Sequence, residues 1–133
     1  MSTRNVEAIH GVYERWGGGD FRVRPDLFDP LVVLVMRPEF PDAGTYIGPE
    51  AIAEYTRSFL EPWTRITIEA EEVVVAGDSV VVAVRQRGVG AGSGIETELR
   101  YCHLWSFRGS KVIRIETFRE RAQAFEAAGL ERA

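Results

Sequence analysis

His103 is the side chain in this sequence best suited to acid–base chemistry. It is one of two histidines, and an imidazole titrates close to neutral pH, as a general acid or base requires. Tyr13 and Tyr101 could hydrogen-bond to it or donate to a ligand oxygen. We therefore take His103, Tyr101 and Tyr13 as candidate catalytic residues. The alternative, which we favour, is that His103 is a buried neutral imidazole bonded to a tyrosine or to a backbone carbonyl.

The sequence lacks the residue patterns typical of phosphate-binding loops, metal sites and disulfide frameworks. Glycines recur from residue 88 to residue 94, but a strand rather than a helix is expected to follow, so a hairpin is favoured over a phosphate-binding loop. The two histidines lie too far apart in sequence to give metal-ligand spacing. The single cysteine, Cys102, excludes a disulfide framework. We expect no cofactor and no metal.

Large apolar side chains supply the candidate ligand contacts. They are Trp16, Tyr46, Tyr55, Phe59, Trp63, Trp105 and Ile115. Most aromatic residues of this kind fill a core rather than contact a ligand, so packing is the favoured role for the tryptophans. Arg85 and Arg87 share one strand face and Gln86 takes the other. We favour an outer or rim position for the arginines, with glutamates such as Glu96 and Glu98 as partners.

The first half of the chain predicts two helices around one strand. Apolar residues from Val6 to Trp16 recur with helical spacing, and glycines 17–19 end that helix. Residues 25–28 fit one helical turn. The aliphatic run 31–36 predicts a strand buried on both faces, and prolines punctuate a loop over 37–44. Gly48-Pro49 opens a second helix that ends near Leu60.

The second half predicts an antiparallel sheet. Long β-branched and aromatic segments over 65–76, 79–87, 95–107 and 111–118 are separated by turns. A short helix over about 120–128 follows, and Gly129 caps it. This order predicts an α+β fold with helices on one face of the sheet.

Alternation along residues 95–107 separates two faces. Tyr101, His103 and Trp105 share the bulkier face, which we expect to meet the helices. Cys102 and Leu104 make the opposite face apolar enough to suggest a partner subunit.

Several segments, in order, resemble the SnoaL-like branch of the nuclear transport factor 2-like superfamily. They are YERWGGGD at 13–20, YIGPEAI at 46–52, SGIE at 93–96, YCHLWSFRGSKVIR at 101–114 and RAQAFEAAGL at 121–130. The resemblance implies a curved, mostly antiparallel sheet that three helices wrap into a cone, the cystatin-like α+β barrel. It also implies an internal apolar pocket and frequent dimerisation through the outer sheet face. Because the family includes isomerases, epoxide hydrolases, cyclases, dehydratases and non-enzymatic binders, fold alone does not give function.

The catalytic sets of the family are mostly missing. By the resemblance, the ketosteroid isomerase base would fall near Met36 or Arg37, neither of which is a carboxylate. Its oxyanion-hole aspartic acid would fall near His103, and its tyrosine near Val12 or Tyr13. The Asp-Arg-Asp group of limonene epoxide hydrolases finds no aspartate on the strand face of Tyr101 and His103. Cyclases need one aspartate as an acid–base residue, but all five aspartates are expected in turns or loops: Asp20, Asp26, Asp29, Asp42 and Asp78.

Composition bounds the remaining possibilities. The 133 residues, 45% hydrophobic and 27% charged, suit one domain spanning 1–133. A net charge of −4 without a basic stripe argues against nucleic acid. No apolar run could cross a membrane, and no signal peptide is recognised, so a cytoplasmic protein is expected. We expect a homodimer that binds a small hydrophobic or weakly polar molecule without known catalysis. The alternative is an isomerase, cyclase or hydrolase with His103 as general acid or base.

Overall fold

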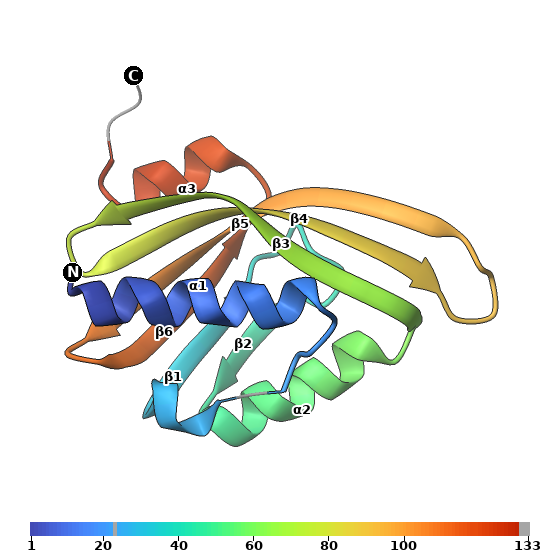
Figure 1. Ribbon diagram of the computed structural model, residues 1–133, viewed down its shortest axis with the longest axis horizontal. Helices are drawn as coiled ribbons and strands as arrows, with labels where there is room; N and C mark the ends of the chain where they lie inside the picture. The colour runs from blue at the N-terminus through green and yellow to red at the C-terminus, as the bar shows by residue number, and fades with distance from the viewer. Residues whose placement is uncertain (23, 131–133) are drawn as a thin grey trace.

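The computed structural model describes residues 1–22 and 24–130, which form an α+β fold with a curved sheet (Figure 1). The elements in chain order are α1 (Thr3–Gly17), the 3-10 helix η1 (Pro25–Leu27), β1 (Phe28–Met36), β2 (Gly44–Ile47), α2 (Pro49–Leu60), β3 (Trp63–Ala76), β4 (Ser79–Gly90), β5 (Glu96–Arg108), β6 (Lys111–Phe118) and α3 (Arg121–Ala127). The strands form one sheet in the order β2-β1-β6-β5-β4-β3. Only β1 and β6 pair in parallel, so the sheet is mixed but mostly antiparallel.

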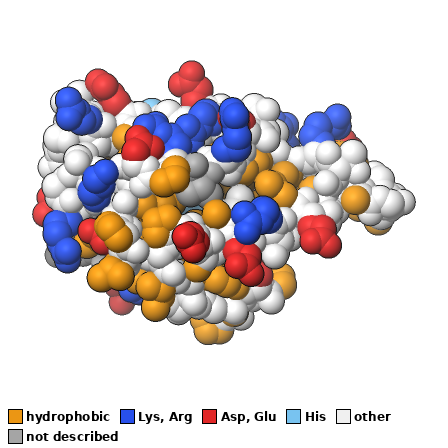
Figure 2. Space-filling model, turned by 90° about the horizontal axis from the view of Figure 1, so that it is seen from below, with side chains coloured by type: hydrophobic (Ala, Val, Ile, Leu, Met, Phe, Trp, Pro, Cys, Tyr) orange, Lys and Arg blue, Asp and Glu red, His pale blue; other side chains and the backbone are white. Residues whose placement is uncertain are grey.

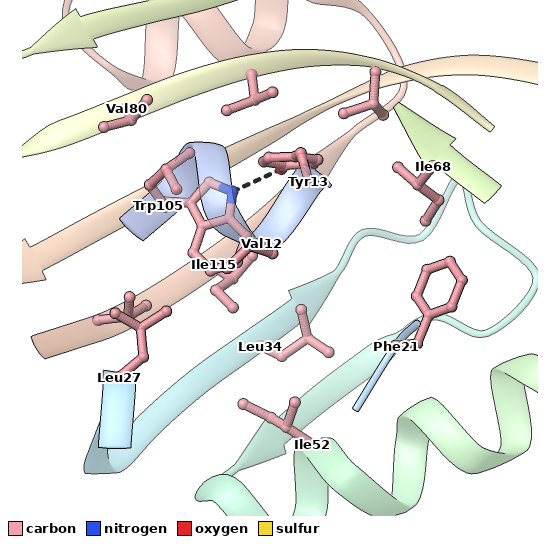
Figure 3. Packing of buried hydrophobic residues seen from close by; sticks show 14 of the residues in the cluster. Val12, Tyr13, Phe21, Leu27, Leu34, Ile52, Ile68, Val80, Trp105 and Ile115 are labelled. Atoms are coloured by element: carbon pink, nitrogen blue, oxygen red, sulfur yellow. Dashed lines mark hydrogen bonds between the residues drawn. The ribbon is translucent and has the colours of Figure 1, made fainter. Parts of the chain in front are cut away.

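Two helices line the inner face of the sheet, and the third lies on its outer face (Figure 1). The side chain of Ser2 caps α1 by accepting a hydrogen bond from the backbone of Asn5. The expected apolar stripe faces the sheet, with Ile9 and Tyr13 buried. In α2, Pro49 occupies the start of the helix and Ile52 is buried. Together α1, α2 and the inner sheet face enclose the main hydrophobic core (Figure 3).

The expectation that residues 31–36 are buried on both faces was wrong. Val32 and Leu34 face the core, whereas Leu31 keeps 75% of its surface exposed. The reason is the position of β1 next to the edge of an open sheet, where a helix covers only the inner side (Figure 1). The edge strand β2 was not predicted. Its four residues follow the proline-rich loop and are too few to show an alternating pattern.

The far ends of β4 and β5, strands of 12 and 13 residues, project from the sheet as a hairpin arm (Figure 1). β4 continues to Gly90, beyond its expected end at Arg87. The ring of Trp63 lies directly on Gly88, where an added Cβ would come within 2.6 Å of the indole. The glycine at this position therefore makes room for a tryptophan that covers the base of the arm.

The outer sheet face differs from the expectation in an informative way. Cys102 and Leu104 are 2% and 7% exposed, because α3 folds back over them and contributes Phe125 to a second apolar cluster. The proposed dimer contact through these two residues was therefore wrong, since the chain itself covers them. Within the described residues, no helix is long and apolar enough to cross a membrane.

Candidate functional site

His103 lies on the inner face of β5, where strand alternation places it, and only 6% of its surface is exposed. The Tyr13 hydroxyl, on α1, is 2.6 Å from His103 Nδ1. The same hydroxyl accepts a hydrogen bond of 2.8 Å from Trp105 Nε1 (Figure 3). The structure thus brings together His103 and Tyr13, two of the three candidate catalytic residues, in one buried chain of hydrogen bonds.

The direction of this chain sets the tautomer of His103. Trp105 can only donate, so the Tyr13 oxygen is the acceptor of that bond. Donation of the Tyr13 proton to Nδ1 is the arrangement that gives the proton, Nδ1 and the Trp105 N–H each a partner, and in it the neutral ring carries its own proton on Nε2. Among the described residues, none forms a hydrogen bond with Nε2, and Nε2 is not one of the fully buried polar atoms without a partner, so it keeps some accessible surface. The ring therefore keeps one N–H donor without a protein partner.

Burial keeps His103 neutral. Removal from water disfavours the imidazolium and lowers the pKa of His103 from 6.5 to about 3. Burial also raises the pKa of the Tyr13 hydroxyl well above its usual value, and the Trp105 bond opposes this only in part. The pair is therefore His and Tyr in their uncharged forms at neutral pH.

Aromatic rings surround the imidazole. Trp16 lies edge-on to His103, with 5.8 Å between ring centroids, and Phe21 stacks on the other side of Trp16 at 5.7 Å. Tyr101 meets His103 edge-on at 5.2 Å. The hydroxyl of Tyr101 does not reach His103 but donates to Oε1 of Gln86 at 2.8 Å. Tyr101 is therefore part of the wall around His103, not of its hydrogen-bond chain.

Two hollows stand out among the described residues, and neither is lined by His103. The larger, about 1180 Å³, lies between α2 and the segment from Gly19 to Pro30. Figure 2 shows this side of the molecule, where hydrophobic side chains gather between charged ones. Phe21 lines this groove and also stacks on Trp16, so it stands between the groove and the aromatic interior.

A second polar cluster involves Asp42, which sequence reasoning left in a loop. The Tyr55 hydroxyl donates to Asp42 Oδ2, and the Tyr46 hydroxyl donates to the Asp42 carbonyl at 3.1 Å. The loop before β2 thus carries one carboxylate to the tyrosines of α2 and β2. The signal that could have found it is the pair of prolines flanking Phe40, since a constrained loop can return its tip to the core.

The other candidate contacts divide by position. Tyr46, Tyr55 and Phe59 pack partly buried beside the main core, and Trp105 and Ile115 are fully within it. Trp63 lies at the start of β3 against Gly88, under the hairpin arm. None of these residues lines either of the two hollows.

The charged residues on the outer face pair across strands. Arg85 and Arg87 lie outside, as favoured, but their partner is Glu69 on β3, at 3.4 and 2.8 Å, rather than a glutamate of β5. Glu71 and Glu72 likewise form ion pairs, with Arg100 and Arg121. No group of three potential metal ligands occurs among the described residues.

Solved structures with the same fold come from several sources. TerC, co-crystallised with polyporic acid, is 22% identical with a TM-score of 0.74, covering 96% of this chain and 99% of that one. A protein from Jannaschia sp. CCS1, described as a SnoaL-like polyketide cyclase, is 21% identical with a TM-score of 0.76, covering 98% of this chain and 94% of that one. A protein from Catenulispora acidiphila with a ketosteroid isomerase-like fold, in complex with trimethylamine, is 16% identical with a TM-score of 0.70, covering 98% and 96%.

At these identities the likeness shows the fold alone. Comparison with curated protein sequences gives no significant match. The model of the SnoaL-like domain matches residues 9–115, which include α1 from Ile9 onward, the His103 strand and most of the core. The chain therefore belongs to the SnoaL-like domain family.

Proposed function

We propose that this protein binds a small, largely apolar molecule that accepts a hydrogen bond from His103 Nε2. The observation that carries the proposal is the unpaired N–H of a buried, neutral imidazole set among aromatic rings. A donor that is largely removed from water gains about 0.5–1.5 kcal/mol from a typical hydrogen bond to an added acceptor. A ligand carbonyl or ether oxygen at this position would recover that energy, while its apolar body packs against Trp16 and Tyr101.

The groove beside α2 offers the route to this position. Phe21 lines the groove and stacks on Trp16, and Trp16 in turn contacts His103. Trp16 is only half-buried, so a rotation of these two rings opens the interior without breaking a hydrogen bond. We propose that the ligand enters here and that its outer part stays in the groove.

Binding fits His103 better than catalysis does. A general base works best with a pKa near the working pH, whereas burial lowers the pKa of His103 to about 3. Its Nδ1 is also occupied by Tyr13. A residue in this state is a fixed hydrogen-bond donor, which orients a ligand but exchanges no proton at neutral pH.

Asp42 supports a second candidate, an isomerase, cyclase or hydrolase. The family's cyclases use an aspartate as acid–base residue, and the structure brings Asp42 to the hydroxyl of Tyr55. In this alternative Asp42 transfers the proton, and the Tyr55 hydroxyl orients the Asp42 carboxylate. Loss of turnover in Asp42→Asn, with His103→Asn still active, would favour catalysis over simple binding once a substrate is found.

The solved relatives agree with a small-molecule role. One was crystallised with polyporic acid and another in complex with trimethylamine. These two compounds differ widely, so the fold accommodates unlike ligands. The class of ligand in this chain must therefore come from its own side chains.

A matched pair of probes tests the proposal. Acetophenone and α-methylstyrene have the same shape, but only the ketone accepts a hydrogen bond. Titrations followed by ¹H–¹⁵N NMR should show both compounds shifting signals near Trp16. His103→Asn should weaken the ketone alone, by about 2–10-fold, as expected for one hydrogen bond. Equal ketone affinity in the variant, or no binding of either compound, would refute the proposal.

We also propose a homodimer, now through another part of the outer face. Leu31 and Ile47 are 75% and 62% exposed, and Val33 lies opposite Ile47 in the register of β1 and β2. These side chains share the face that α3 leaves uncovered. Their burial against a second copy would remove apolar surface from water. Leu104 could not contribute in this way, because it is already buried within the chain.

A further inference from the structure

Asp42 is a carboxylate without a cationic partner. Among the described residues, no arginine, lysine or histidine forms an ion pair with it, whereas Asp20 and Asp26 each hold a neighbouring arginine at 2.8 Å. Asp42 is also half-buried, not fully open to water. A negative charge that is partly removed from solvent and unpaired favours an oppositely charged ligand.

The surroundings of Asp42 are aromatic. The rings of Tyr46 and Tyr55 have centroids 4.8 Å apart, and Tyr55 stacks with Phe59 at 6.2 Å. The two tyrosine hydroxyls fix the loop by donating to Asp42, one to the carboxylate and one to the backbone. The faces of such rings carry negative electrostatic potential and attract cations within about 6 Å of the centroid.

The neighbouring phenols do not neutralise the carboxylate. Burial, the hydrogen bond to Asp42 and the charge of Asp42 together raise the pKa of Tyr55 far above its ordinary value. Burial and the same charge also raise the pKa of Tyr101. Both phenols stay protonated, so they act as donors or as neutral walls. The cluster therefore presents one negative charge lined by electron-rich rings.

We propose that Asp42, Tyr46, Tyr55 and Phe59 bind the ammonium group of an organic amine. The carboxylate supplies the counter-charge, and the ring faces supply cation–π attraction and contact for the alkyl groups. A metal ion fits poorly, because calcium and magnesium need several oxygen ligands and this cluster offers one carboxylate. The inference goes beyond the proposed His103 site, because it assigns to the Asp42 cluster a second ligand class, a cation with an apolar body.

Choline and 3,3-dimethylbutan-1-ol form the decisive pair of probes. They have the same shape, but a carbon atom replaces the charged nitrogen in the alcohol. Titration by ¹H–¹⁵N NMR should show choline binding at least about 10-fold more tightly than the alcohol, with shifts centred on residues 42–46 and 55–59. Equal affinities, or shifts confined to other residues, would overturn the inference.

Substitutions then locate the site. Asp42→Asn keeps the shape and removes the charge, so choline affinity should fall by at least about 10-fold. Asp78→Asn makes the same chemical change in the turn between β3 and β4 and should leave the affinity unchanged. Tyr46→Leu keeps Asp42 and removes one ring, so choline should weaken again while the alcohol does not. Unchanged choline binding in folded Asp42→Asn, or an equal loss in Asp78→Asn, would overturn the inference.

The outcomes separate this inference from the proposed function. If acetophenone binding depends on His103 but choline and its neutral isostere bind equally, the ammonium site is wrong and the small-molecule function stands. If choline binding depends on Asp42 while acetophenone affinity is unchanged in His103→Asn, the cluster at Asp42 binds amines and the proposed His103 site is wrong. Each site therefore has its own probe and its own variant.

Discussion

Tyr13 and His103 join α1 to the middle of the sheet through a hydrogen bond of 2.6 Å. The same hydroxyl accepts from Trp105, so one oxygen satisfies two buried groups on neighbouring positions of one strand face. This bond fixes how α1 lies across β5. It also decides which nitrogen of His103 is left for a ligand.

Tyr13→Phe should destabilise the fold while keeping its ring packing. The variant leaves Trp105 Nε1–H and His103 Nδ1 without a partner, and each unpaired buried group costs about 1–3 kcal/mol. Urea unfolding measures the loss. Tyr46→Phe serves as control, because its hydroxyl makes one half-buried bond to a backbone carbonyl and should matter less. Similar losses in the two variants would contradict the buried hydrogen-bond chain.

Strand alternation was enough to predict the inner position of His103, because β5 is long and a one-residue shift would expose Tyr101 and Trp105. The partner tyrosine also followed, since the helical stripe placed Tyr13 toward the sheet. The position of Asp42 beside Tyr55 could not be predicted, because a loop has no repeating hydrophobic pattern from which its path can be inferred. The cover over Leu104 was missed for a similar reason: the local pattern of α3 shows an apolar face but not which strands receive it.

One substitution at two glycines should change stability in opposite directions. Gly11 lies inside α1 with no atom within 4 Å of an added Cβ, so Gly11→Ala should stabilise by about 0.5–1 kcal/mol. At Gly88 the added Cβ would meet the Trp63 ring at 2.6 Å. Gly88→Ala should therefore destabilise by about 1–3 kcal/mol through overpacking. Thermal unfolding of both variants checks the signs, and a tolerated Gly88→Ala would show that Trp63 does not lie on the strand.

Two arginine substitutions should separate dimerisation from folding. Ile47 is exposed on β2, so Ile47→Arg should keep the fold and shift the protein to monomer in sedimentation velocity at micromolar concentration. Leu104 is buried beneath α3, so Leu104→Arg should lower the unfolding temperature, whatever the oligomeric state. A wild-type monomer, or a dimer that Ile47→Arg leaves intact, would contradict the proposed contact through β1 and β2.

The pH dependence of stability should report the burial of His103. Burial lowers its folded pKa from 6.5 to about 3, whereas the unfolded chain takes up the proton near the ordinary value of about 6.5. Between these values the unfolded state binds more protons, so the free energy of unfolding must fall as the pH is lowered through this window. Above pH 6.5 His103 contributes no slope.

Two measurements check this. NMR titration of the ring, in a His10→Gln background that leaves one histidine signal, should show no protonation of His103 down to at least about pH 5, since its pKa lies well below that of an ordinary histidine. Urea unfolding of wild type and His103→Asn between about pH 7 and pH 5 should give a steeper loss for wild type, because the variant lacks the titrating group and carboxylates contribute little there. A ring pKa at or above 6.5, or equal slopes in the two proteins, would mean that His103 is solvated and that its Nε2–H needs no ligand.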